Sequence, residues 1–360
     1  MSLLSGITRK LKEDARNVAK TPVETLRDAK YTVNGVRRGE IPPSKPLKTV
    51  GATLGAIVLV AGLMFPIYWI LTAALSGSGG SIYSSGGLQL LPEDPSLQPF
   101  IWVVGDLIVP GYAIDISVPL TDLAVAINTP ELTFLDASDY GVERTSEFKR
   151  FFWNSLTVSI PTVIIAMCLI VPASYALSRR EFIFRRKILF MYVLLTQVGG
   201  GLGIALLIGL YAVYVQVGLN NSKLALSVYY AATAVPFNTW LLKTYMDGIP
   251  VSYEEAAVVD GAPPWRVVTE VIIPLSAAGL ATVFIFVFLT GWTEFVVAQT
   301  LLGTENYTLP VGLFSLVSEY SIPWARFSAF ALTFAAPIML VYLFAQRYIE
   351  GGLSFSGMEG

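Results

Sequence analysis

The sequence contains no histidine and only one cysteine, Cys168. The missing imidazole excludes a histidine general base, a histidine zinc ligand and a histidine-ligated haem. A single thiol excludes an intrachain disulfide and a thiolate metal cluster. Charge is scarce as well: 14% of the 360 residues are charged and the formal net charge is −2. Nothing here provides the basic field that nucleic-acid binding needs.

Apolar residues make up 54% of the chain, and they are gathered into uncharged runs. A bilayer core about 30 Å thick requires roughly 20 such residues in a helix. Six stretches are long enough: 49–76, 151–178, 188–222, 224–242, 271–293 and 327–346. The third has glycines clustered at 199, 200, 201 and 203 and is too long for one straight span, so we expect a break in it or an outer loop around 218–222. The pattern predicts an all-α membrane protein with six transmembrane helices.

The distribution of lysine and arginine predicts the orientation. Eleven basic residues precede the first helix and five lie between 179 and 187, whereas 77–150 has three against ten acidic residues. Basic residues are retained on the cytoplasmic side, so both termini should be cytoplasmic and the acidic segment external. We therefore expect a surface extension over 1–48, helix 1 over 49–76, an external loop over 77–150, helices 2–6 over 151–347 and a cytoplasmic tail over 348–360. Short strands are expected in the external loop, around 101–109 and 131–135.

The chain has no phosphate-binding loop of the G-x-x-x-x-G-K-[ST] type, and the glycines at 199–201 follow no strand. Energy for active transport would then have to come from another polypeptide. The predicted spans also lack the ionisable residues of many secondary transporters. Glu294, at the end of the fifth helix, is the nearest one. It has two open interpretations, a helix-packing residue at the outer interface and a residue on the translocation path.

The loop between the fourth and fifth helices, 243–270, is the most informative segment. Pro250 ends the preceding segment, and Ser252 can cap a new helix whose first turn holds two glutamates. Gly261, followed by two prolines, ends that helix. A helix of about two turns is marginal in water on its own. We therefore expect it to dock against a partner.

Glu255, Ala256, Ala257 and then Gly261, followed by Val271, Ile273 and Pro274, keep a fixed spacing. It resembles the EAA loop of ABC-importer permeases, in which E-A-A, three residues, G and nine residues precede I-x-L-P. This sequence departs from that pattern only by Val271 and Ile273, which are similar in shape and polarity to the family residues. Further along, the residues around Trp292 to Phe295 and Tyr307 to Gly312 are similar to the carbohydrate branch of the family, and the C-terminus resembles its maltose-permease group.

The resemblance implies a coupling helix that sits in a cleft of an ATPase subunit. It assigns the ATPase-coupling role to Glu254, Glu255, Ala256, Ala257, Asp260, Gly261 and Pro274. It also implies that the tail, including Gly352, Leu353 and Ser354, contacts the ATPases, with a turn at 351–353, although a disordered terminus is the alternative. Within that scheme Glu294 is the residue on a possible pathway.

Taken together, the sequence predicts a permease subunit of an ATP-driven importer for a sugar or oligosaccharide in a prokaryotic cell membrane, not an enzyme. The resemblance implies as partners an ABC ATPase dimer, a second permease, an external substrate-binding protein and membrane lipid, with no nucleic acid. This chain should hold no cofactor, because ATP and Mg²⁺ would bind the ATPase. The alternatives are a permease for another solute, such as a polyamine or glycerol phosphate, and a secondary carrier.

Overall fold

The computed structural model describes residues 38, 42, 44–77, 83–84, 87–88, 91–92, 94–109, 113–117, 124–128, 132–201, 203–317 and 322–356. Most of the expected extension 1–48 and the last four residues lie outside this set. The chain divides into two compact units, Met1–Trp69 and Ile70–Gly360. Helix α2 (Ser44–Ala74) accounts for most of what is described in the first unit, and its exposed side chains from Val50 to Leu71 are largely apolar. It matches the first predicted span.

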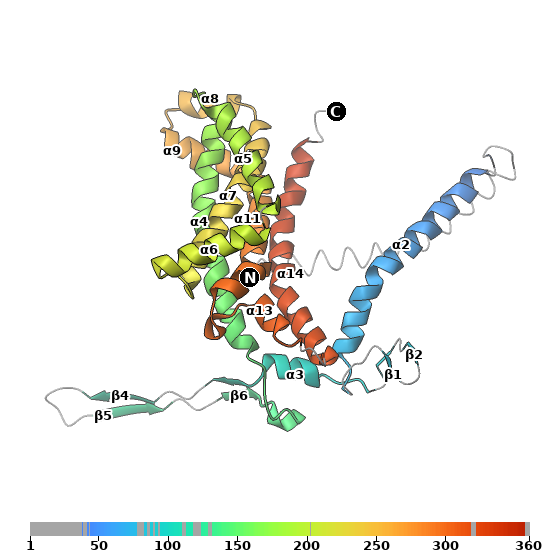
Figure 1. Cartoon of the computed structure of the whole chain (residues 1–360). Coiled ribbons are helices and arrows are strands. Elements are labelled where there is room, and N and C mark those ends of the chain that lie inside the picture. Colours follow the sequence, from blue (N-terminus) through green and yellow to red (C-terminus); the bar gives the residue numbers. More distant parts are fainter. Residues whose placement is uncertain are drawn as a thin grey trace. The chain divides into compact units, whose positions relative to one another are not determined.

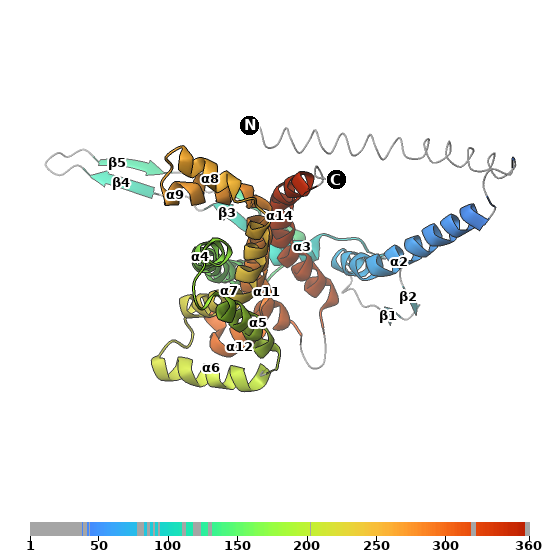
Figure 2. The ribbon, with the colours of Figure 1, turned by 90° about the horizontal axis from the view of Figure 1, so that it is seen from above.

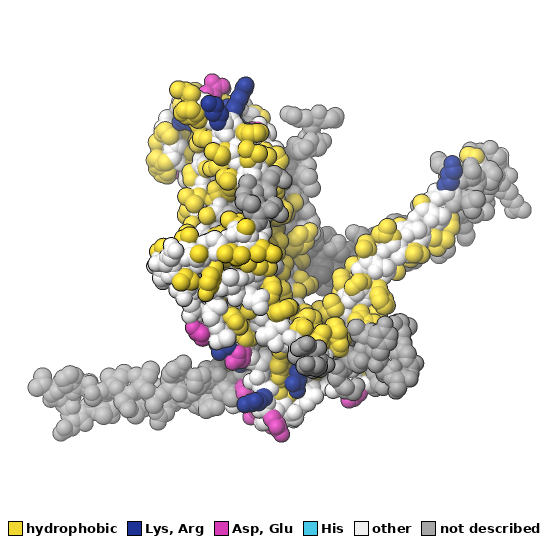
Figure 3. Space-filling view, in the orientation of Figure 1, with side chains coloured by type: hydrophobic (Ala, Val, Ile, Leu, Met, Phe, Trp, Pro, Cys, Tyr) yellow, Lys and Arg dark blue, Asp and Glu magenta, His cyan; other side chains and the backbone are white. Residues whose placement is uncertain are grey.

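The second unit is built on four helices: α4 (Phe148–Arg179), α7 (Lys223–Asp247), α11 (Ala277–Thr293) and α14 (Trp324–Ser356). Figures 1 and 2 show α4, α7 and α11 side by side, and α11 also contacts α14. The apolar core is largest around Trp292, Phe330 and Leu309, all of which are fully buried. In Figure 3 the charged side chains of this bundle gather towards its two ends, and hydrophobic side chains cover the face between them.

Small and hydroxyl-bearing side chains line the contact between α4 and α7. Four of them are fully buried: Thr162, Ser174, Ser227 and Thr239. The Ser227 hydroxyl donates to the Val158 carbonyl at 2.9 Å, and the Ser174 hydroxyl donates to the Thr239 carbonyl at 3.0 Å. In lipid, helices associate through such close packing and interhelical hydrogen bonds, because burial of apolar surface gives no net gain there.

The span count differs from the expected six when it is judged by length and apolar composition alone. Among the described residues, three helices qualify: Lys48–Ala74, Phe148–Arg179 and Trp324–Ile349. A bent pair, Pro264–Leu275 with Ala277–Thr293, would make a fourth. The described structure is therefore mostly helical, as predicted.

The third predicted stretch forms two helices, α5 (Arg185–Gly201) and α6 (Gly203–Val217), rather than one. A turn follows α6, with Gly218 and Asn221 in the left-handed region at φ 73° and 62°. Glycine and asparagine tolerate this conformation best. The expected break is therefore present, and so is a turn at 218–222.

The segment between α2 and α4 contains short antiparallel pairs: β1 (Tyr83–Ser84) with β2 (Gly87–Leu88), β3 (Leu107–Val109) with β6 (Leu132–Leu135), and β4 (Ala113–Ser117) with β5 (Ala124–Asn128). The strand expected over 101–109 is wrong in its first half, which belongs to helix α3 (Gln98–Val104). Pro99 suits the first turn of a helix, and Trp102 and Val103 are buried on one side of it. A 3₁₀ turn, η1 (Ser138–Tyr140), follows β6.

Short helices connect the long ones. After α7 come α8 (Ser252–Val259), α9 (Pro264–Arg266), a π-helical turn η2 (Val267–Ile272) and α10 (Ile273–Leu275). After α11 come α12 (Val296–Leu301), a 3₁₀ turn η3 (Thr304–Asn306) and α13 (Leu309–Phe314). The turn expected at 351–353 is wrong, because α14 continues through it to Ser356. A helix continues through glycine where the backbone hydrogen bonds still form, at a modest loss of stability.

Candidate functional site

The predicted short helix is present as α8, at the end of the bundle where α4 ends (Figure 1). It begins at Ser252, which makes no capping hydrogen bond, so the expected capping role of Ser252 is not seen. Its C-terminus is a Schellman motif: the Ala262 amide donates to the Ala257 carbonyl at 2.9 Å and the Gly261 amide to the Val258 carbonyl at 3.0 Å. Gly261 has φ 84°, and a Cβ there would meet no atom within 4 Å. Backbone conformation, rather than crowding within this chain, therefore requires glycine.

The two glutamates of α8 face opposite ways. Glu254 is buried and pairs with Arg179 at the end of α4. Its second oxygen accepts a hydrogen bond from the Tyr175 hydroxyl at 3.1 Å. Glu255 is exposed. The sequence grouped both as coupling residues and gave no role to Arg179, which lies 75 positions away. The sequence offered one signal for this pair: a basic residue at the end of one predicted span, and acidic residues on a loop predicted to lie at the same membrane face.

The outward surface of α8 and its flanks combines small, acidic and apolar groups. Glu255, Ala256 and Asp260 are exposed, and Ala257 is half-buried. Five large apolar side chains are 52–85% exposed around them: Val251, Tyr253, Val258, Val259 and Trp265. Such a contiguous apolar surface beside charged groups is typical of a protein interface.

Pro274 lies where α10 turns sharply into α11. The two helical segments are bent by 81°. A proline in a helix has no amide to donate to the carbonyl four residues earlier, and the π-helical turn η2 directly precedes it. The bend is completed by Ser276, whose buried hydroxyl donates to the Ile272 carbonyl at 2.6 Å. Pro274 is thus part of the bend that joins the α8 region to a long helix.

Glu294 immediately follows α11 and is half-buried. Its carboxylate accepts hydrogen bonds from the Val297 amide at 3.0 Å and the Ala298 amide at 3.2 Å, in the first turn of α12. The Tyr230 hydroxyl of α7 also donates to it. These contacts are those of a helix-packing residue, and a place on the translocation path stays a prediction. Gly352, Leu353 and Ser354 lie on the last turns of α14, where the structure describes the backbone only.

A polar network that the sequence did not predict joins the turn after α6 to the turn after α12 and to α4. The Asn221 side chain accepts from the Gly303 amide at 2.8 Å and donates to the Glu305 carboxylate at 2.5 Å. Asn154 on α4 donates to the Glu305 carbonyl at 2.9 Å. Hydrogen bonds within its own residue and from Asn221 hold the pKa of the Glu305 carboxyl below its ordinary value of 4.5. The local signal in the sequence is the asparagine itself, because asparagine favours turns and tolerates the left-handed conformation that Asn221 adopts.

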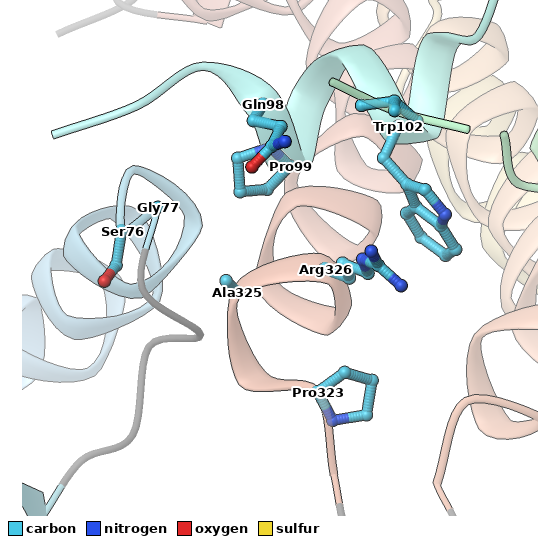
Figure 4. A pocket seen from close by; sticks show the side chains of 9 residues that line it. Ser76, Gly77, Gln98, Pro99, Trp102, Pro323, Ala325 and Arg326 are labelled. Atoms are coloured by element: carbon cyan, nitrogen blue, oxygen red, sulfur yellow. The ribbon is translucent and has the colours of Figure 1, made fainter. Parts of the chain in front are cut away.

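A cavity of about 230 Å³ lies between α3 and the first turn of α14 (Figure 4). Arg326 and Trp102 line it, with the guanidinium 5.2 Å from the ring centroid. None of the residues predicted for coupling or for the pathway contributes to it. The cavity and α8 therefore belong to opposite ends of the bundle.

Comparison with known proteins identifies the family of this chain. Residues 151–354 match the family model described as "binding-protein-dependent transport system inner membrane component". The chain is 31% identical over 304 residues to the maltose/maltodextrin transport system permease protein MalG of Vibrio vulnificus (strain YJ016), covering 83% of this chain and 91% of that protein. It is 29% identical over 267 residues to the galactooligosaccharides transport system permease protein GanQ of Bacillus subtilis (strain 168), covering 73% and 90%.

A third relative is the inner membrane ABC transporter permease protein YcjP of Escherichia coli (strain K12), 27% identical over 317 residues, with 88% of this chain and 98% of that protein covered. The fold is also that of a solved chain from a bacterial ABC transporter involved in the import of the acidic polysaccharide alginate. The TM-score is 0.62 at 19% identity, over 86% of this chain and 98% of that one. This chain is a multi-pass membrane protein that belongs to the family of inner membrane components of binding-protein-dependent transport systems and acts as an ABC-importer permease.

Proposed function

We propose that this permease carries a sugar or oligosaccharide and that α8 is the coupling helix through which an ATPase subunit drives it. Closure of the ATPases on ATP would displace α8 and reorient the long helices between an outward-open and an inward-open state. The chain itself contributes no catalytic group, and ATP and Mg²⁺ would be held by the ATPase. The role of α8 is thus to couple the free energy of nucleotide binding in one chain to the reorientation of the solute path in another.

The observation that carries the proposal is the outward face of α8. An eight-residue helix exposes Tyr253, Val258 and Val259, and leaves Glu255 available as an acceptor for a basic partner group. Ala256 permits a partner to approach the helix backbone closely. A helix this short is stabilised by its Schellman end and by Glu254, so its exposed face can be apolar without loss of the fold.

Two observations favour a neutral solute such as a sugar. The names of the relatives MalG and GanQ give maltose/maltodextrin and galactooligosaccharides as the transported solutes. The central parts of the helices, 151–178, 224–242, 277–293 and 327–346, contain no lysine or arginine that an anionic solute would favour and no carboxylate that a polyamine would favour. A permease for glycerol phosphate or a polyamine is therefore the weaker alternative, and a secondary carrier has no use for the exposed face of α8.

We further propose six spans: α2, α4, α5 with α6, α7, α11 and α14. The basic residues before α2 and between α4 and α5 support a cytoplasmic location for both termini and for α8. The acidic segment 77–150 is then external, where it can receive a substrate-binding protein. An ATPase dimer and a second, related permease complete the complex.

The first test is affinity purification of the tagged chain from its own membranes in mild detergent, with identification of the proteins that accompany it. We expect an ATPase with a phosphate-binding loop and a second permease. The reconstituted complex should then import radiolabelled maltotriose or a labelled galactooligosaccharide. Recovery of the folded chain alone, with α8 accessible to protease, would contradict the coupling role.

Gly261→Leu tests the site itself, because leucine at φ 84° costs about 1–2 kcal/mol and distorts the end of α8. We expect normal membrane insertion, weaker recovery of the ATPase and strongly reduced uptake. Gly248→Ala is the control, since Gly248 has φ −74° and belongs to the turn before α8. Normal uptake by Gly261→Leu would be incompatible with coupling through α8.

A further inference from the structure

The ion pair between Arg179 and Glu254 is the most protected charge pair among the described residues that bear on α8. The two side chains are 10% and 11% exposed. Both carboxylate oxygens are engaged from α4, one by the Arg179 guanidinium and the other by the Tyr175 hydroxyl at 3.1 Å. Arg179 also donates to the Ile249 carbonyl at 2.8 Å, in the turn that leads into α8.

These bonds connect three elements, of which α4 is distant in sequence from the other two. The end of α4, the turn after α7 and the body of α8 meet at one guanidinium. A buried ion pair resists separation, because removing one partner leaves an uncompensated charge in a medium of low dielectric constant. A force that displaces α8 is therefore resisted at Arg179 and transmitted to the helix that carries it.

Other charge pairs of this end do not have this property. Lys243 and Asp247 pair within α7, and Arg266 and Glu270 pair at 3.1 Å one helical turn apart, with side chains that are 50% and 59% exposed. Exposed pairs within one helix contribute little and connect nothing new. The pair of Arg179 and Glu254 differs by being buried and by joining elements that are distant in sequence.

We propose that Arg179 and Glu254 form a strut that transmits movement of the coupling helix α8 to α4, with Tyr175 holding the carboxylate in position. The inference rests on the proposed coupling role of α8 and adds a route into the membrane helices. Glu254 and Arg179 are positioning residues, whereas the neighbouring Glu255 faces the ATPase. Breaking the strut uncouples the ATPase from α4 without detaching it from α8.

The test uses the complete complex purified with its ATPase, compared without nucleotide and after trapping with ATP and vanadate. Hydrogen exchange is measured in α8 and in the last two turns of α4. In the natural protein both segments should change on trapping. In Glu254→Gln and in Arg179→Gln we expect the change in α8 to remain and that in α4 to fall roughly tenfold. Reversal of the pair in one chain, R179E with E254R, should restore it. Reversal of Arg266 and Glu270 is the matched control and should leave both changes intact.

Equal exchange of α4 in the nucleotide-free state verifies that the variants are folded. A vanadate-dependent change in α4 that survives in both single variants overturns the strut, and so does a reversed pair that fails to restore it. Failure of the proposed function looks different: trapping would then leave α8 itself unchanged in the natural protein. Loss of the α4 change alone supports the strut.

Discussion

Gly279 on α11 has no side chain, and the ring of Tyr245 on α7 occupies the space where one would begin. A Cβ at this position would lie 2.6–2.9 Å from the Tyr245 side chain, near its attachment to the backbone, where it has little freedom to move. The two helices can therefore approach this closely only with glycine, as is common between membrane helices.

We predict that Gly279→Ala destabilises the protein by about 1–3 kcal/mol, as overpacking does. In mild detergent the apparent Tm should fall by several degrees. Gly209→Ala on α6 is the matched control, because a Cβ there meets nothing within 4 Å and alanine favours a helix. Equal Tm values for the two variants would contradict the packing argument.

The hydrogen bond between the Glu305 carboxylate and the Asn221 side chain is expected to depend on pH. Its folded-state pKa is lowered by hydrogen bonds within its own residue and from Asn221. A lowered carboxyl pKa contributes stability above the unfolded pKa, and that stability is lost as the pH falls through the folded value. The contribution is thus complete at neutral pH and disappears in acid.

We predict that the natural protein has a higher apparent Tm than Glu305→Gln at pH 7, and that the difference closes as the pH falls from about 5 to about 3. Glu143→Gln, the same change at another exposed position, is the control, and its difference in Tm from the natural protein should not follow this pattern. A difference that stays constant with pH would assign the effect to packing rather than to the charge.

The individual residues divide into those that sequence identified and those that it missed. The positive φ of Gly261 and the exposure of Glu255 follow from local patterns, a helix end and a helix face. The inward orientation of Glu254 depends on Arg179, on another helix. The network of Asn221, Glu305 and Asn154 depends on two separate turns meeting helix α4. Contacts of this kind are set by tertiary packing, which no local pattern contains.

The bend between α10 and α11 is the element whose geometry most directly links the α8 region to the bundle. Pro274 cannot donate a backbone hydrogen bond, so the helix widens into η2 ahead of it and turns by 81°. A residue with an amide at this position would permit a regular helix.

We predict that Pro274→Ala opens the bend. Spin labels attached to cysteines at Arg266 and Phe286, after replacement of Cys168 by serine, should move further apart in the variant. Pro337→Ala is the control, because Pro337 lies within the uninterrupted helix α14. An unchanged distance in Pro274→Ala would mean that the hydroxyl of Ser276 sets the bend.

The elements themselves were largely predictable. The uncharged stretches 151–178, 224–242 and 327–346 correspond to α4, α7 and α14, whose ends extend beyond them by one to five residues, except that α14 continues ten residues further at its C-terminus. The stretch 188–222 became two helices, because glycines near 200 and a left-handed turn at 218 interrupt it. Composition shows that a segment is apolar, but it does not show whether the segment runs straight.

At the scale of the whole molecule, the segment 77–150, which we propose to be external, takes no part in coupling through α8. Its strands β3 and β6 pair antiparallel, with Val109 opposite Leu132, so the hairpin region 110–131 can be replaced by a two-residue turn without moving either strand. We interpret this region as a surface for the substrate-binding protein.

We predict that replacing 110–131 by Asn-Gly, a favoured two-residue hairpin turn, lowers stimulation of ATP hydrolysis by the binding protein at least about fivefold while basal hydrolysis is unchanged. The measurement is the ATPase rate of the reconstituted complex with and without the binding protein of the same system. Full stimulation would show that the binding protein docks elsewhere, for example at the cavity beside Arg326.

The buried hydroxyl groups between α4 and α7 impose an order on biosynthesis. The hydroxyls of Thr162 and Ser174 meet backbone carbonyls of α7 only when α7 lies against α4, yet α5 and α6 are synthesised between the two helices. While α7 is still within the ribosome, these hydroxyls face lipid or another transient partner. A membrane insertase that shields α4 until α7 emerges would therefore raise the yield of folded permease, whereas α2, which carries no comparable polar stripe, can leave the insertion machinery at once.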